Sequence, residues 1–100
     1  MRFEFHPEAL AEYDAAAAYY AQRGNGLDLR FVAAVEQAVE KILDNPTRWR
    51  ILDGDVRRCL TRVFSYAILY SIEPDYILII AVMHCRREPG YWVHRLKGRA

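Results

Sequence analysis

The chain has 100 residues, of which 53% are hydrophobic and 27% are charged, and its formal net charge is +1. This length predicts a single domain over residues 1–100, and the composition is typical of a globular protein and excludes a disordered chain. The longest apolar run covers residues 76–83. A membrane-spanning helix needs about 20 apolar residues, so we expect no membrane partner.

The N-terminus and the two cysteines indicate the compartment. Met1 leads directly into a charged, strand-like segment instead of the basic and apolar regions of a secretory signal. Cys59 and Cys85 are too few for a disulfide framework, and we interpret both as buried thiols, with a disulfide as the less favoured alternative. We therefore expect a protein of the reducing cytoplasm.

The first half of the chain predicts one strand and two helices. Residues 2–6 alternate between polar and apolar side chains, which indicates a short strand. A helix is expected from Pro7, since proline is tolerated in the first helical turn, and its apolar face would carry Leu10, Tyr13, Ala17 and Tyr20. The turn at residues 24–26 leads to a second helix, about residues 27–44, which ends before Pro46.

The second half predicts three strands. Residues 47–55 are expected to form a loop with a turn at residues 53–55. Strands follow at about residues 56–61, 66–72 and 76–85, joined by tight connections, with the first at the sheet edge. The last strand is apolar on both faces, which predicts the central strand. Residues 91–96 are expected to form a short helix or an extended tail.

The order of elements is therefore β-α-α-β-β-β with a short C-terminal element. Two amphipathic helices bury their apolar faces when they pack as a hairpin on a sheet. We predict an α+β fold in which an N-terminal helical hairpin covers one face of a small, mostly antiparallel sheet.

Arginine gathers in the second half of the chain. Residues 1–50 hold six basic and eight acidic residues, whereas residues 51–100 hold eight basic and five acidic residues, and twelve of the fourteen basic residues are Arg. Arginine suits planar, bidentate contact with phosphate or carboxylate, although a GC-rich genome is an equal explanation for the overall bias. The candidate binding residues are Arg57, Arg58, Arg62, Arg86, Arg87, Tyr91 and Trp92.

Two runs resemble the RelE/ParE superfamily of bacterial toxins. They are Arg58-x3-Arg62-x-Phe64-Ser65-Tyr66-x-Ile68-x-Tyr70 and Ala81-Val82-x-His84-x-Arg86-Arg87-x-Pro89-x-Tyr91-Trp92-x2-Arg95. The resemblance covers essentially the whole chain. It implies the toxin of a type II toxin–antitoxin module, also described as plasmid stabilisation, with a helical hairpin on a small sheet. It also implies an antitoxin partner of the ParD or RelB kind in a hetero-oligomer.

The superfamily divides by mechanism. ParE-like members poison DNA gyrase, whereas RelE-like members cut mRNA in the ribosomal A site without a metal. RelE-like members commonly use lysines before the second strand, where this chain has Arg48, Arg50, Arg57 and Arg58. The resemblance therefore favours growth inhibition through gyrase. The alternatives are a metal-free ribonuclease and a partner-bound protein with weak or lost toxicity.

A ribonuclease would need a base, an acid and a cationic phosphate clamp. The candidate catalytic residues, in that case only, are Arg62, His84, Arg86, Arg87 and Tyr91. The arginines would clamp the phosphate, and His84 and Tyr91 would move protons, although a tyrosine pKa near 10 would have to be strongly perturbed. We expect no cofactor and no metal, because His6, His84 and Cys85 lack the spacing of metal ligands.

Several of these residues also have structural interpretations. Arg58 and Arg62 on an edge strand would keep that edge soluble. Tyr66, Tyr70 and Tyr76 favour core or cross-strand packing over a platform for nucleic-acid bases. For Trp92, the structural interpretation is that its side chain covers the end of the sheet.

Overall fold

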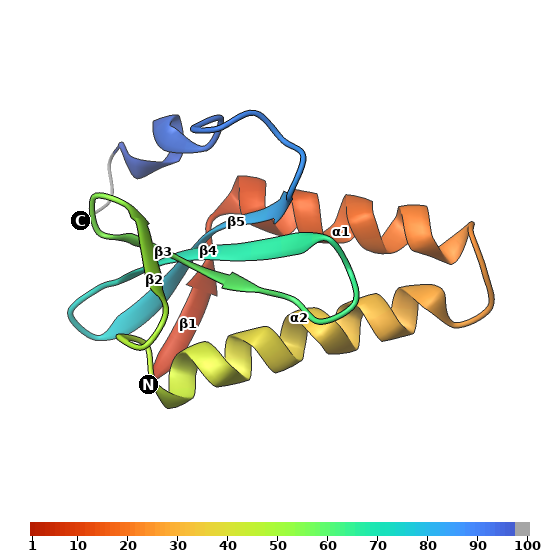
Figure 1. Cartoon of the computed structure of the whole chain (residues 1–100), viewed down its shortest axis with the longest axis horizontal. Helices are drawn as coiled ribbons and strands as arrows, with labels where there is room; N and C mark the ends of the chain where they lie inside the picture. The colour runs from red at the N-terminus through yellow and green to blue at the C-terminus, as the bar shows by residue number, and fades with distance from the viewer. Residues whose placement is uncertain (98–100) are drawn as a thin grey trace.

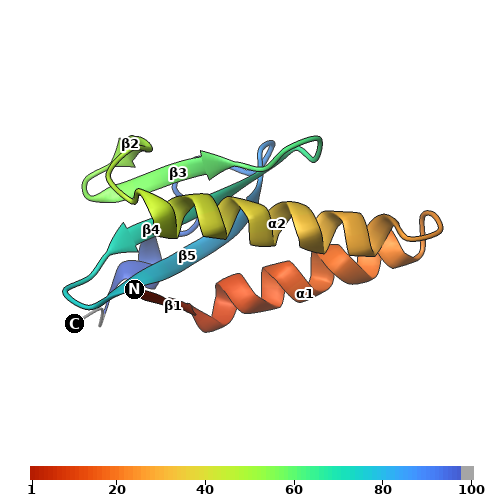
Figure 2. The same ribbon diagram turned by 90° about the horizontal axis from the view of Figure 1, so that it is seen from below.

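Two helices lie against one face of a five-stranded sheet in the computed structural model, which describes residues 1–97 (Figures 1 and 2). The elements are β1 (Arg2–Phe5), α1 (Pro7–Ala21), α2 (Leu27–Asp44), β2 (Arg50–Asp53), β3 (Val56–Leu60), β4 (Tyr66–Ile72), β5 (Tyr76–His84) and the 3₁₀ helix η1 (Val93–Leu96). The predicted α+β fold with an N-terminal helical hairpin is confirmed.

The strands have the order β1-β5-β4-β3-β2, in which β1 is parallel to β5 and the other neighbours are antiparallel. The mostly antiparallel sheet is therefore confirmed. The middle strand is β4, so the prediction that β5 is central was wrong. Both strands are buried along most of their length, and an apolar run alone does not distinguish the middle strand from its neighbour.

The loop predicted at residues 47–55 contains β2, which is a correction to the expected order. Arg50 pairs with Arg58, and Ile51 pairs with Arg57, across a turn in which Gly54 has a φ of 57°. All four residues of β2 are exposed, so the strand has no buried face that would produce an apolar alternation. In the observed strand order, β2 is the outer strand and β3 lies one strand inside the edge.

The main core lies between the helices and the sheet. Phe31, Val35 and Ile42 of α2 are almost completely buried there. The buried face of α1 is centred on Ala9 and Ala16 instead of Leu10, which is 44% exposed. These alanines let α1 approach the sheet closely, while Tyr13, Ala17 and Tyr20 pack at the side of the core.

A second apolar cluster lies on the opposite face of the sheet. Leu69 belongs to this cluster and its neighbour Tyr70 to the main core, because successive strand residues point to opposite faces. Trp92 from the C-terminal segment packs into the second cluster and is 2% exposed. Trp92 was expected to cover the end of the sheet, and in the structure it covers part of the helix-free face.

The two cysteines differ. Cys59 is buried, as expected, whereas Cys85 is exposed because it follows the last residue of β5, so its predicted burial was wrong. Both thiols are free. Within residues 1–97, neither helix is long and apolar enough to cross a bilayer.

Candidate functional site

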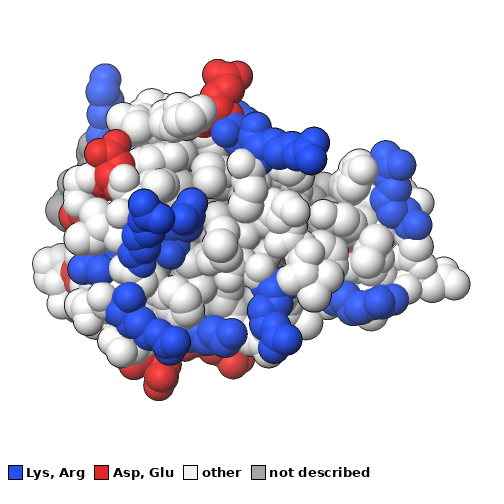
Figure 3. Space-filling model, in the orientation of Figure 1, with Lys and Arg blue, Asp and Glu red and all other residues white. Residues whose placement is uncertain are grey.

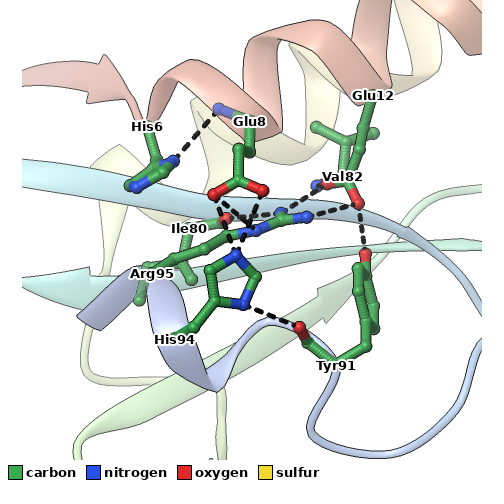
Figure 4. A network of polar contacts seen from close by, with 8 residues as sticks. All are labelled: His6, Glu8, Glu12, Ile80, Val82, Tyr91, His94 and Arg95. Carbon is green, nitrogen blue, oxygen red and sulfur yellow. Dashed lines mark hydrogen bonds and ion pairs between the residues drawn. The ribbon is translucent and has the colours of Figure 1, made fainter. Parts of the chain in front are cut away.

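A buried ion pair joins α1 to the C-terminal segment (Figure 4). The Glu12 carboxylate accepts from the Arg95 guanidinium at 2.8 Å (Nη1 to Oε1) and 3.0 Å (Nη2 to Oε2). Arg95 Nη1 also donates to the Ile80 carbonyl at 3.0 Å, and the Val82 amide donates to Glu12 Oε1 at 3.0 Å. Strand β1 pairs with β5 only along residues 76–79. Beyond β1, these side chains supply the hydrogen-bond partners that the backbone groups on this edge of β5 would otherwise lack.

Tyr91 belongs to the same network. Its hydroxyl donates to Glu12 Oε2 at 2.5 Å. Burial, and then this bond to a carboxylate, raise the pKa of Tyr91 well above its ordinary value of 10.0. The Arg87 guanidinium carbon lies 3.8 Å from the centre of the Tyr91 ring, so the ring also positions a cation.

His84 lies at the end of β5 and has a defined orientation. Its Nδ1 accepts from the Arg86 amide at 3.1 Å, and its ring packs edge-on against Tyr66 with centroids 5.1 Å apart. An acceptor role for Nδ1 places the proton of the neutral imidazole on Nε2. The nitrogen of His84 that faces away from Arg86 is therefore a donor.

A groove of about 300 Å³ brings together three of the residues predicted from the sequence. His84, Arg87 and Tyr91 line it, and the remaining lining residues are Glu12, Ala15, Ala16, Tyr19, Tyr66 and Val82. Arg86 is exposed beside it in the turn that follows β5. The groove thus runs between α1, the end of β5 and the C-terminal segment.

The three arginines around β3 do not converge. Arg57 faces the helices, where its Nη1 donates to the carbonyls of Thr47 (3.0 Å) and Trp49 (2.7 Å), so it ties down the loop before β2. Arg58, the next residue in the strand, points to the opposite face. Arg62 lies in the β3–β4 turn and lines a different groove from the one that holds Tyr91.

Arginines from two strands meet on the helix-free face. Arg50 and Arg58 are directly opposite each other in the antiparallel pair β2·β3. Like charges in such positions repel, so the fold gains nothing from this arrangement. Figure 3 shows Lys and Arg side chains gathered over β2 and β3, with the acidic side chains in this view at the rim. This face is suited to an acidic partner.

Comparison with known proteins identifies the family. A family model described as "ParE toxin of type II toxin-antitoxin system, parDE" matches residues 3–89. The chain belongs to the ParE toxin family. A solved structure described as "Chromosomal ParDE TA system from P. aeruginosa" matches with a TM-score of 0.72 and 16% identity, over 84% of this chain and 95% of that chain. This likeness shows the fold alone. No curated protein matches the chain.

In this ParE-family toxin, the groove is poorly equipped for proton transfer. Tyr91 holds its proton against Glu12, and the pKa of its hydroxyl is raised, whereas a general base needs a lowered one. The carboxylate of Glu12 is occupied by Arg95 and by the Val82 amide. Within residues 1–97, no group of three or more His, Cys, Asp or Glu side chains is placed to hold a metal ion.

Trp92 is a core residue of this toxin instead of a surface residue. Its 2% exposure shows that most of its side chain packs against the sheet, and its predicted role in binding a partner stays a prediction. The side chain forms one wall of a groove of about 310 Å³ on the helix-free face. Leu52, Met83 and Arg87 also line that groove, which places Arg87 between the two grooves of the toxin.

Three residues of this arrangement are not among the candidate site residues predicted from the sequence: Glu12, Arg50 and Arg95. Glu12 follows Ala9 by three residues and precedes Ala16 by four, a spacing that places it on the buried face of α1. A carboxylate on a buried face requires a cationic partner. The sequence predicted a different buried face, which included Leu10 and Tyr13, so it gave no signal for this pair. Arg50 was missed because β2 was interpreted as a loop.

Proposed function

We propose that this ParE-family toxin inhibits growth by binding DNA gyrase, without cutting RNA, and that a cognate antitoxin of the ParD kind neutralises it. One observation carries the choice of binding over cleavage: the two candidate proton carriers are committed to other bonds. Tyr91 donates to Glu12, and His84 uses Nδ1 to accept from Arg86. RNA cleavage without a metal needs a free base for the 2′-hydroxyl.

Exposed arginines support the binding role. Arg86 and Arg87 are exposed in the turn after β5, and the opposed pair Arg50 and Arg58 lies on the helix-free face. Arginine is enriched among the residues that dominate binding energy at protein interfaces. A surface with these cations complements an acidic surface on the target or on the antitoxin.

The antitoxin follows from the family. The family description names a type II toxin–antitoxin system, and the structural neighbour comes from a ParDE system. A toxin–antitoxin hetero-oligomer is the expected resting form. In it, an amphipathic and acidic segment of the antitoxin would cover part of the arginine-bearing surface.

The test expresses the toxin with and without the small protein encoded by the neighbouring reading frame, and reads growth, gyrase and mRNA in parallel. Alone, the toxin should arrest growth and trap cleaved DNA on purified gyrase, and the neighbour should restore growth. The double variant Arg50→Glu/Arg58→Glu should lose gyrase inhibition, whereas the control Arg23→Glu, an exposed arginine stacked on Tyr19, should retain it. Unimpaired growth, or mRNA cleavage with gyrase untouched, would refute the proposal.

Ribosome-dependent mRNA cleavage is the second candidate. It draws on the convergence of His84, Arg87 and Tyr91 in one groove. In that case Arg86→Ala, Arg87→Ala and Tyr91→Phe should each slow cleavage and leave antitoxin affinity largely intact. Intact transcripts after induction of the toxin would exclude this candidate.

A further inference from the structure

The turn between β3 and β4 holds a valine in a backbone conformation that valine avoids. Val63 has a φ of 73°, and the Phe64 amide donates to the Arg62 carbonyl at 2.8 Å, which closes a three-residue turn around Val63. A positive φ is unfavourable for a β-branched residue, and turns of this kind are rare and strained. Val63 is also 95% exposed, so packing of its side chain does not explain the strain.

The surrounding contacts force this conformation. Thr61 Oγ1 donates to the carbonyls of Phe64 (2.8 Å) and Tyr66 (3.2 Å). The Phe64 ring is anchored between Tyr20 and Phe31, with centroids 5.0 and 5.4 Å away. A strained, exposed residue that persists because its neighbours over-determine it is a frequent feature of sites that hold a ligand.

The turn forms one wall of a groove against the N-terminal half of α2. The groove has a volume of about 410 Å³ and is lined by Leu27, Arg30, Ala33, Ala34, Gln37, Arg62, Val63 and Phe64. Figure 2 shows the turn projecting beyond the sheet on the side of α2. The lining thus has an apolar floor, two arginines and no acidic residue.

Neither arginine is neutralised by the toxin itself. Within residues 1–97, Arg30 and Arg62 form no ion pair with a carboxylate. Two guanidinium groups beside an apolar floor complement a segment that carries carboxylates next to an apolar side chain. The charge of the lining therefore favours an acidic peptide as the occupant.

We propose that this groove is a docking site for an acidic and apolar segment of the antitoxin, with Val63 as its apolar contact and Arg30 and Arg62 as its ionic contacts. An apolar side chain of the segment lies on Ala33, Ala34 and Phe64 and covers Val63. This inference rests on the proposed function insofar as it requires an antitoxin. It is independent of whether the toxin acts on gyrase or on mRNA.

The experiment measures the affinity of the purified antitoxin for toxin variants by titration calorimetry, together with the melting temperature of each variant. Arg30→Glu and Arg62→Glu should each weaken binding about tenfold or more. Raising the salt from about 0.1 M to about 1 M should weaken binding to the wild type more than to either variant. Arg48→Glu, an exposed arginine beyond the other end of α2, is the matched control.

Val63→Gly separates a binding role from a structural one. Glycine adopts a positive φ without strain, so this variant should melt at a higher temperature and yet bind the antitoxin several-fold more weakly. A residue with a purely structural role would not gain stability and lose affinity together. A second copy of the toxin as occupant would instead appear as dimerisation that Arg62→Glu abolishes, and would overturn the proposal.

The remaining outcomes are distinct. Equal affinities of the antitoxin for the wild type and both charge reversals would place the docking site elsewhere and leave the proposed function intact. Tighter binding to the reversals would identify a basic segment and refute the acidic one. If no antitoxin binds the wild type, the antitoxin half of the proposed function fails, and this site fails with it.

Discussion

The C-terminal segment and the β3–β4 turn are both held in place by side chains, in opposite ways. The C-terminal segment is held by a bidentate ion pair between Glu12 and Arg95, in which Arg95 is 6% exposed and the Glu12 side chain is 18% exposed. The turn is held by hydrogen bonds and an aromatic anchor around a strained residue, Val63, that is 95% exposed. In the C-terminal segment, stability depends on the ion pair between Glu12 and Arg95. In the turn, the strain at the exposed Val63 lowers stability.

This difference indicates which segment belongs to the scaffold. A buried ion pair cannot lose one partner without leaving a charge in a poorly solvated position. An exposed strained residue can be relaxed without harm to the fold, so its retention calls for an explanation outside the fold. Mutations at the two places should therefore change stability in opposite directions.

The largest effect is expected for Glu12→Ala. The substitution leaves the Arg95 guanidinium buried without its carboxylate and removes the acceptor of the Val82 amide. The free energy of unfolding should fall by about 3–5 kcal/mol, measured by urea denaturation. The arginine on the Tyr91 ring, Arg87, should lose its fixed position as well, because Tyr91 donates to the same carboxylate.

Glu8→Ala is the matched control for that substitution. Glu8 lies one turn earlier on α1 and pairs with His94 at 2.9 Å, but half of its side chain is exposed. Its removal should change stability much less than the removal of Glu12, since exposed ion pairs contribute little. Similar losses in the two variants would show that the burial of the Glu12 pair is not what holds the segment.

A gain in stability is expected for Val63→Gly. Relief of the positive φ should raise the free energy of unfolding by about 1–3 kcal/mol. The greater freedom of glycine in the unfolded chain should lower it by about 0.5–1 kcal/mol. The free energy of unfolding should therefore rise by about 1–2 kcal/mol in the same urea experiment. A loss of stability would mean that the Val63 side chain packs against the fold.

Gly54→Ala provides the opposite change at a similar φ. Gly54 has a φ of 57° in the β2–β3 turn, and a Cβ added there would meet no atom within 4 Å. The substitution adds the backbone strain that Val63 already carries, and it should cost about 1–2 kcal/mol. Opposite signs for these two variants would isolate the backbone conformation as the cause.

The same comparison explains what could be predicted from the sequence. The apolar patterns of the sequence located both helices and four of the five strands. Of these strands, β3, β4 and β5 have a buried face. The segment β2 has none, and its pairing partner is recognised only through the turn at Gly54. The side chains of Arg57 and Arg58 point to opposite faces of the sheet, because successive residues of a strand alternate. They therefore do not form the single binding surface that was predicted.

The candidate site was predictable only in part. His84, Arg87 and Tyr91 are close in the chain, and they do line one groove. The contact between Glu12 and Arg95 joins residues 83 positions apart, so only the packing of α1 on β5 brings them together. The strain at Val63 left no signal, because valine is among the residue types least expected at a positive φ.

A modest loss of stability is expected for Tyr70→Phe in the main core. The Tyr70 hydroxyl donates to the Pro46 carbonyl at 2.6 Å, which links β4 to the loop that follows α2. The loss of this bond should cost about 1 kcal/mol at neutral pH. This variant therefore probes a contact that is neither ionic nor strained. A cost as large as that of Glu12→Ala would remove the distinction between the ion pair and the rest of the scaffold.

The buried hydroxyl of Tyr70 should also make the stability of the protein depend on pH in the alkaline range. Burial raises the pKa of Tyr70 to about 12, whereas the unfolded chain releases the proton near the ordinary value of 10.0. The folded state therefore binds more protons between these values, and the free energy of unfolding of the wild type should fall as the pH rises from 10 to about 12. Tyr70→Phe should weaken that fall. Parallel slopes in the wild type and this variant would show that Tyr70 keeps an ordinary pKa despite its burial.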